Sequence, residues 1–330
     1  MNKRSLVIFL ILLILVLFIL QDIFFIDKLV SVLSCHVDIP INISQSILSQ
    51  FYSSDAHEKK EGSKQIIEKT LINLGYDNWL PYLEYIDISI FQSNIMPDNA
   101  EELIVALNLS KDQAVIAIYT QTGQEYVYAN KIENLLPIQD IQFMKNPETN
   151  YNFIITTQLL DERLGGFFIE KFIEIYYFVQ DNFQSVWKKN KYSEEIFNLQ
   201  WQDPTASPNH WRKIIESNMI EFKHTETPSI SVNIHRQFLK AIHQGFPSIK
   251  DFSLESELRY QEAFHWSPKY NHFIMKEAVH RETEETFGII EDTSGWVEHI
   301  LGFSSNNYIV ISSEGTIRYV SKDTLIITDK

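Results

Sequence analysis

The chain lacks a second cysteine, because Cys35 is the only one among its 330 residues. An intrachain disulfide and a cysteine-rich zinc site are therefore excluded. Basic residues are also few, since 28 Lys and Arg stand against 43 Asp and Glu and the formal net charge is −15. A surface of this sign repels phosphate backbones, so the composition argues against a nucleic-acid partner.

Motifs for several common chemistries are missing as well. The sequence contains no G-x-x-x-x-G-K-[ST] or G-x-G-x-x-G phosphate loop, no G-x-S-x-G nucleophile elbow and no H-E-x-x-H zinc motif. Adjacent carboxylates such as Glu194 and Glu195 point to opposite faces of a strand, so they cannot share one proton. The sequence therefore predicts no catalytic residue and no cofactor. Two distant carboxylates of a hydrolase would leave no such motif.

A long apolar run near the N-terminus is the clearest feature that is present. Residues 6–20 are all apolar, and residues 23–26 extend the run past Gln21 and Asp22. About 20 apolar residues span the core of a bilayer. Lys3 and Arg4 precede the run, so the positive-inside rule predicts a cytoplasmic N-terminus and an extracytoplasmic body. We interpret residues 1–28 as a short tail with a transmembrane anchor, which makes the membrane a partner through residues 6–26.

Two other interpretations of this segment stay open. The run could be a signal peptide that is cleaved, although it ends without an A-x-A site and is long for one. The stretch VLSC at residues 32–35 resembles a bacterial lipobox, in which Cys35 would be acylated. That cysteine lies well beyond the apolar run, so the uncleaved anchor is the interpretation that the pattern favours.

Beyond the anchor, the pattern predicts a tether over residues 29–62 and a β-rich extracytoplasmic domain over residues 63–330. A helix is expected at residues 64–74, with Ser63 as its N-cap and Gly75 after its end. Further short helices are expected near residues 207–218 and 233–245, where Ile234, Phe238 and Ile242 have helical spacing.

Short strands rich in Val, Ile and Tyr dominate the remainder of the chain, each bounded by turn-forming residues. We expect them at residues 87–91, 101–109, 114–121, 125–132, 151–160, 171–180, 183–190, 219–224, 229–234, 260–267 and in five segments of residues 287–329. The predicted fold class is mainly β, with antiparallel meander sheets that are propeller-like but partial or irregular, and a few peripheral helices. Residues 63–285 would hold repeat-like sheets, and residues 286–330 a C-terminal β unit.

Two segments carry a resemblance to a known family. The stretch PDNAEELIVALNLSKDQAVIAIY at residues 97–119 resembles a unit of the FG-GAP/VCBS-type repeats of bacterial surface proteins and integrin propellers. Residues 172–190, FIEIYYFVQDNFQSVWKKN, resemble the closing hairpin of such a unit. The resemblance covers residues 86–266 and implies propeller-like sheets with an acidic loop before a buried strand.

That resemblance makes Asp98, Asn99, Glu101 and Glu102 the candidate metal ligands, with calcium as the candidate ion. The loop departs from the family pattern, because it has no alternating Asp series and no glycine turn. A solvated turn that leads into a buried strand is the alternative interpretation.

Three tryptophans are candidate interaction residues, namely Trp187, Trp201 and Trp266. Tryptophan is enriched at the energetic centres of interfaces, but such residues also commonly close a β core, which is the interpretation that the pattern favours. The hypothesis that unites these features is a single-pass cell-membrane protein whose extracytoplasmic domain binds or scaffolds another envelope protein without catalysis. The alternative is an envelope hydrolase, directed at glycans, that uses loop carboxylates.

Overall fold

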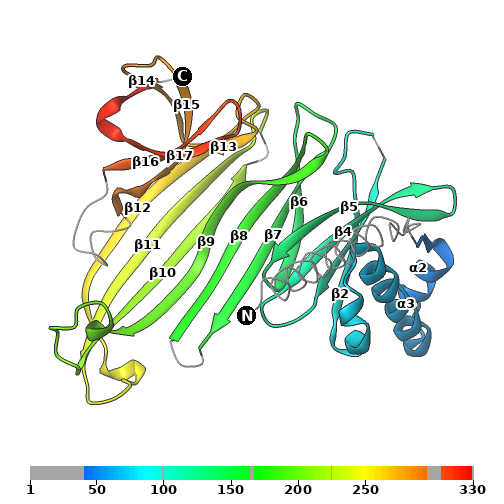
Figure 1. Cartoon of the computed structure of the whole chain (residues 1–330), viewed down its shortest axis with the longest axis horizontal. Coiled ribbons are helices and arrows are strands. Elements are labelled where there is room, and N and C mark those ends of the chain that lie inside the picture. Colours follow the sequence, from blue (N-terminus) through cyan, green and yellow to red (C-terminus); the bar gives the residue numbers. More distant parts are fainter. Residues whose placement is uncertain (1–40, 99, 164–166, 224, 296–305, 329–330) are drawn as a thin grey trace, which may run out of the picture. The chain divides into compact units, whose positions relative to one another are not determined.

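Residues 41–98, 100–163, 167–223, 225–295 and 306–328 are described by the computed structural model (Figure 1). They form three antiparallel sheets with a few helices, so the prediction of a mainly β, antiparallel fold is confirmed. The sheets contain five, eight and five strands, whereas the blade of a propeller has four. No helix of the described residues is long and apolar enough to cross a membrane, and the predicted anchor at residues 6–26 lies outside them.

The first sheet, here the N-terminal sheet, has the strand order β1-β5-β4-β3-β2. Its strands are β1 (Ile43–Ser44), β2 (Asp87–Ser93), β3 (Glu102–Asn108), β4 (Ala114–Thr122) and β5 (Glu125–Leu135). The central strands are apolar without interruption over residues 103–107 of β3 and 114–119 of β4, and both faces of these segments are buried. Such continuous apolar strands form where a sheet is covered on both sides.

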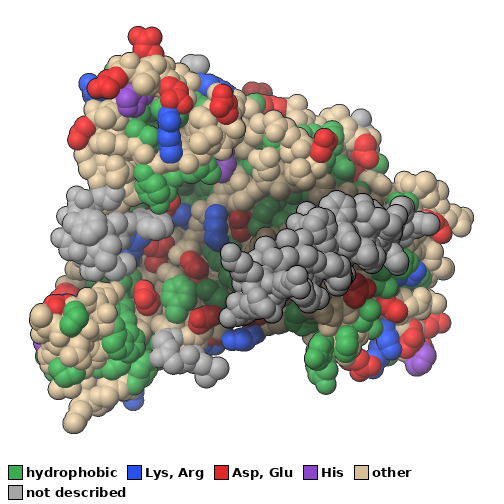
Figure 2. Space-filling view, viewed as in Figure 1, with side chains coloured by type: hydrophobic (Ala, Val, Ile, Leu, Met, Phe, Trp, Pro, Cys, Tyr) green, Lys and Arg blue, Asp and Glu red, His purple; other side chains and the backbone are tan. Residues whose placement is uncertain are grey.

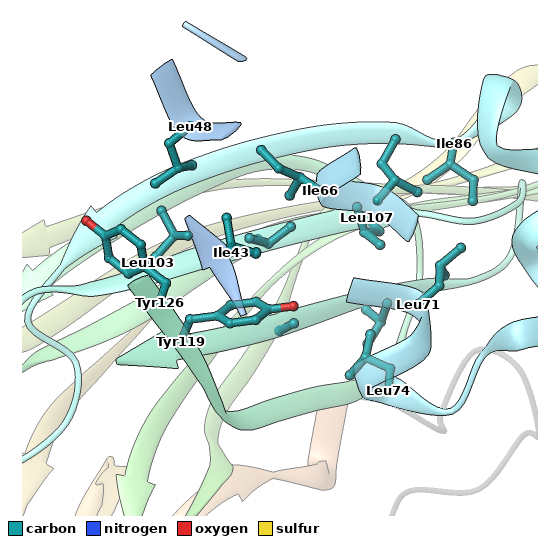
Figure 3. Packing of buried hydrophobic residues seen from close by; sticks show 14 of the residues in the cluster. Ile43, Leu48, Ile66, Leu71, Leu74, Ile86, Leu103, Leu107, Tyr119 and Tyr126 are labelled. Atoms are coloured by element: carbon teal, nitrogen blue, oxygen red, sulfur yellow. The ribbon is translucent and has the colours of Figure 1, made fainter. Parts of the chain in front are cut away.

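Helices cover one face of the N-terminal sheet, as Figure 3 shows for the buried side chains between them. They are α2 (Gln45–Phe51), α3 (Ala56–Leu74) and the 3-10 helix η1 (Asp77–Tyr85). The other face of β3 and β4 packs against the next sheet, where Ile104 and Ile116 share a cluster with Ile154. The N-terminal sheet is therefore the middle layer of this part of the molecule.

The start of the folded region differs from the predicted tether. Residues 41–62 form β1, α2 and the first turns of α3, and the side chain of Ile43 is completely buried. Helix α3 begins eight residues before the predicted residue 64, because Asp55 rather than Ser63 is its N-cap and accepts hydrogen bonds from the amides of His57 and Glu58 at 2.8 and 3.0 Å. Its end was predicted correctly, since Gly75 follows it with a left-handed φ of 74°.

The second sheet, here the central sheet, is a meander with the strand order β13-β12-β11-β10-β9-β8-β7-β6. It curves as a half-barrel (Figure 1). Its strands are β6 (Ile138–Lys145), β7 (Asn152–Glu162), β8 (Phe167–Val179), β9 (Asn182–Asn198), β10 (His210–Lys223), β11 (Ser229–Ile242), β12 (Ser253–Ser267) and β13 (His272–Ile274).

The two helices expected near residues 207–218 and 233–245 are wrong, because these segments belong to β10 and β11. A spacing of four residues fits one turn of a helix, but it is also two periods of a strand. Ile230, Val232 and Ile234 are buried at alternate positions, which is the period of a strand, whereas Ile242 is 78% exposed. The spacing of four that indicated a helix therefore arises because Ile234 and Phe238 lie on the same face of one strand, two strand periods apart.

The third sheet, here the C-terminal sheet, has the order β17-β16-β15-β14-β18. Its strands are β14 (Lys276–His280), β15 (Thr286–Asp292), β16 (Asn307–Ser312), β17 (Ile317–Ser321) and β18 (Leu325–Thr328), with the 3-10 helices η4 (Thr293–Gly295) and η5 (Lys322–Thr324). The sheet starts at residue 276 rather than at the predicted 286, because β14 lies between β15 and β18.

Candidate binding site on the central sheet

A cavity of about 430 Å³ lies on one face of strands β8–β11. Cross-strand register builds its first row, in which Phe168 is opposite Glu195, Glu195 opposite Ile214, and Ile214 opposite Phe238. Residues directly opposite one another in an antiparallel pair point to the same face. Three of the four side chains are apolar, so Glu195 lies in an apolar row.

The second row lies two residues away from the first on each strand, later in the sequence on β8 and β10 and earlier on β9 and β11. It runs from Glu170 to Ser193, Glu216 and Arg236, and all four also line the cavity. Figure 2 shows a hollow near the middle of the drawn face in which basic, acidic and hydrophobic side chains lie together. The site therefore combines an apolar row with a charged row, each contributed by four consecutive strands.

One ion pair in the charged row is buried and fully engaged. The guanidinium of Arg236 donates two hydrogen bonds to Glu216 Oε2, with the bond from Nε at 2.8 Å. The side chains are only 12% and 9% exposed. Asn218 Nδ2 donates to the other carboxylate oxygen of Glu216 at 2.7 Å. Because both charges are compensated, this pair forms part of the cavity lining and offers no unpaired charge to a ligand.

A second pair links the central sheet to the C-terminal sheet. The ammonium of Lys189 lies 2.7 Å from Glu262 and 4.0 Å from Glu291 of β15. Tyr260 lies near both pairs, and burial raises the pKa of its phenol to about 12, with Arg236 opposing that shift. The phenol therefore stays neutral at physiological pH.

Two carboxylates in the cavity are unpaired, in a lining that also contains Lys188, whose ammonium lies over the ring of Phe172. Neither Glu170 nor Glu195 has a hydrogen-bond or ion-pair partner in the described part of the chain, and burial raises the pKa of Glu195. They are diagonal neighbours on β8 and β9, which places their backbone positions roughly 7–8 Å apart. An incoming hydrogen-bond donor or cation would therefore find two acceptors beside the aromatic wall.

The neighbouring carboxylate, Glu194, points away from this site. It forms an ion pair at 2.7 Å with Lys213, which is not among the residues lining the cavity. Opposite orientation of Glu194 and Glu195 is what the sequence predicts for a strand, and this prediction is confirmed. Their chemical surroundings differ completely although they are adjacent in the chain.

The acidic loop that was the candidate calcium site has a different organisation. Glu102 is completely buried, and its Oε2 accepts from the amides of Ile95 and Met96 at 2.7 and 3.2 Å. Asp98 accepts from the amide of Ala100 at 3.1 Å. Within the described residues no three His, Cys, Asp or Glu side chains are grouped to hold a metal, and Asn99 lies outside them.

The remaining acidic candidate, Glu101, is exposed and directly precedes strand β3. Burial raises the pKa of Glu102 to about 7, and the nearby Asp98 contributes to that increase. The carboxyl of Glu102 therefore fixes the conformation of the loop by accepting hydrogen bonds from the amides of Ile95 and Met96. Calcium binding by this loop stays a prediction.

The three candidate tryptophans have different positions. Trp187 and Trp266 are each 3% exposed and belong to the core on one face of the central sheet. There they pack edge-to-face against Phe264 and Phe153, respectively. Trp201 is 60% exposed. Only Trp201 of the three is thus placed to contact a partner directly.

Comparison with known proteins gives no family for the chain. No protein-family model and no curated protein matches its sequence. The resemblance to FG-GAP/VCBS-type repeats therefore stays a prediction. The residues of the cavity, Glu170, Glu195, Glu216 and Arg236, were missed from the sequence because only the strand register brings them together.

Proposed function

We propose that the chain is a membrane-anchored, extracytoplasmic binding protein that takes a ligand into the cavity of the central sheet without transforming it. The cavity carries the proposal, because Phe168, Ile214 and Phe238 offer an apolar surface beside the unpaired Glu170 and Glu195. Ligand sites are typically concave and apolar, with a few polar groups that fix orientation. The ligand class that this lining fits is an amphipathic molecule with an aromatic or aliphatic body and a cationic end.

A pair of probes with the same shape and opposite charge tests this proposal. The full chain, reconstituted in lipid nanodiscs, is titrated with phenethylamine and with 3-phenylpropionate by isothermal titration calorimetry. We expect the amine to bind and the carboxylate to bind much more weakly. Because a charge-assisted hydrogen bond contributes about 1.5–3 kcal/mol, Glu195→Gln should weaken the amine by about tenfold or more. Phe238→Ala should weaken both probes.

The control is Glu221→Gln, which removes the same charge from an exposed position on the opposite face of β10. It should leave binding of the amine unchanged. Equal affinity for both probes, or an equal loss in Glu195→Gln and Glu221→Gln, would contradict a specific site in the cavity.

A second candidate function, glycan hydrolysis, is favoured by the spacing of Glu170 and Glu195. Glycosidases use two carboxyl groups about 5–10 Å apart, one of which acts as an acid with a raised pKa. Glu195, whose pKa is raised by burial, would be that acid, and Glu170 the partner. Incubation with peptidoglycan and release of reducing ends measures this activity. Release that persists in both Glu195→Gln and Glu170→Gln would refute the assignment.

A further inference from the structure

Large hydrophobic side chains are exposed together at one end of the central sheet. Two connections form this end, the β9–β10 loop with the 3-10 helix η2 (Leu199–Trp201) and the β11–β12 loop with η3 (Ile249–Asp251). We call this end the apolar tip; its exposed residues are Trp201 (60% exposed), Ile242 (78%), Phe246 (55%), Ile249 (77%) and Leu254 (52%). Contiguous exposed apolar surface of this kind marks an interaction site.

The two loops of the apolar tip are held together by specific contacts. The ring of Trp211 lies between them, with its centroid 5.7 Å from Trp201 and 5.4 Å from Phe246. Its indole Nε1 donates to the carbonyl of His243 at 3.2 Å, and the amide of His243 donates to the carbonyl of Asn209 at 2.9 Å. The exposed side chains of the apolar tip are therefore carried by two loops that are fixed to each other through Trp211 and His243.

Charge at the apolar tip differs from that of the whole chain, which carries −15. Arg212 and Lys240 both pair with Glu255. Asp251 accepts hydrogen bonds from the amide and hydroxyl of Ser248, and Lys250 is its neighbour. With Asp203 of the β9–β10 loop, three acidic and three basic side chains lie around the tip, so this surface does not repel a lipid headgroup layer.

We propose that the apolar tip inserts into the interface of the lipid bilayer that anchors the chain. Tryptophan is enriched at the level of the headgroups, and aliphatic side chains beside it favour the acyl boundary. The anchor at residues 6–26 and the start of the folded region at residue 41 are separated by residues 27–40, which extend to roughly 50 Å at most. A body on so short a connection stays within reach of the same membrane. The inference rests on the anchor of the proposed function.

The test uses the full chain in phosphatidylcholine liposomes. In a Cys35→Ser background, Ile249→Cys is labelled with an environment-sensitive fluorophore, and nitroxide groups on the lipid acyl chains serve as quenchers. The control carries the same fluorophore at Tyr85→Cys in η1, where the native side chain is 82% exposed. We expect quenching at residue 249 to exceed that at residue 85 several-fold, with unchanged thermal unfolding in both variants.

The possible outcomes distinguish the insertion of the apolar tip from the transmembrane anchor on which it rests. If the protein floats with the liposomes and both fluorophores are equally accessible to water, the insertion of the tip is refuted and the anchor stands. If the fluorophore at residue 249 is shielded from water but unquenched by the lipid, a protein surface covers the tip and the inference is also refuted. Protein that does not float with the liposomes refutes the anchor and the inference together.

Discussion

Glu102 shows how one buried carboxyl group makes stability depend on pH. Its pKa is about 7 in the folded protein, against an ordinary 4.5. Between these two values the carboxyl keeps a proton in the folded state that it has lost in the unfolded state, so the contribution of Glu102 to the free energy of unfolding falls as pH rises from 4.5 to 7. The difference amounts to about 3 kcal/mol over this window.

We expect Glu102→Gln to remove most of this pH dependence, because an amide oxygen can still accept from the backbone amides of Ile95 and Met96. Urea unfolding of the wild type and the variant at a series of pH values between 4 and 8 measures it. Burial lowers the pKa of His272 to about 4, which contributes a slope of the opposite sign, so the difference in slope between the two proteins is the test. A variant with the same slope as the wild type would contradict the assignment to Glu102.

The buried pair of Glu216 and Arg236 gives a second prediction at the scale of residues. Arg236→Met leaves Glu216 as an uncompensated buried charge, which typically costs about 3–5 kcal/mol. The double variant Arg236→Met, Glu216→Gln should recover most of that loss, since no charge is then buried alone. Urea unfolding of the four proteins of this cycle measures the coupling. Additive losses would show that the two side chains act independently.

At the scale of elements, Gly62 determines how α3 crosses α2. A Cβ atom at this position would lie 2.5 Å from the backbone nitrogen of Phe51 and 2.9 Å from the carbonyl carbon of Gln50. These are backbone atoms, so the helices must move apart. We expect Gly62→Ala to destabilise the protein by about 1–3 kcal/mol despite the better helix propensity of alanine. Lys64→Ala, two positions along and exposed, is the control for the thermal midpoint.

Elements could be predicted from the sequence where the apolar pattern has a single interpretation. The segment before Asn108 and the segment around Ile116 are apolar without interruption, and both are buried strands. The pattern around Ile234 and Phe238 has two interpretations, since a spacing of four fits a helix and a strand. Burial of alternate residues in β11 decides between them, and burial depends on neighbouring strands that the local sequence does not specify.

The cavity could not be predicted for the same reason. Glu195 and Arg236 are 41 positions apart in the chain, and they meet only because β8–β11 pair in one register. Local sequence correctly indicated that Glu194 and Glu195 diverge. Strand β10 determines the surroundings of each glutamate, because its Lys213 and Ile214 lie on opposite faces. Glu194 is on the face of Lys213 and forms an ion pair with it, whereas Glu195 is on the face of Ile214 and lines the cavity. Non-local pairing therefore determines the site.

At the scale of the whole molecule, the boundary of the folded unit can be tested with two truncations. Residues 41–330 form one compact unit, in which Ile43 and Leu48 belong to the core between the helices and the N-terminal sheet. A chain that starts at residue 41 keeps both side chains. A chain that starts at residue 63, where the predicted tether ends, loses them together with β1, α2 and the first turns of α3.

Burial of each large aliphatic side chain contributes about 1.5–3 kcal/mol, so the shorter chain should lose at least about 3–6 kcal/mol relative to the longer one. Circular dichroism melting of the two chains measures this difference. We expect a cooperative transition for residues 41–330 and a much lower or absent transition for residues 63–330. Equal midpoints would show that residues 41–62 are dispensable and that the tether extends to residue 62. A folded 41–330 chain would also separate the two proposed membrane contacts, because any flotation with liposomes would then depend on the apolar tip alone.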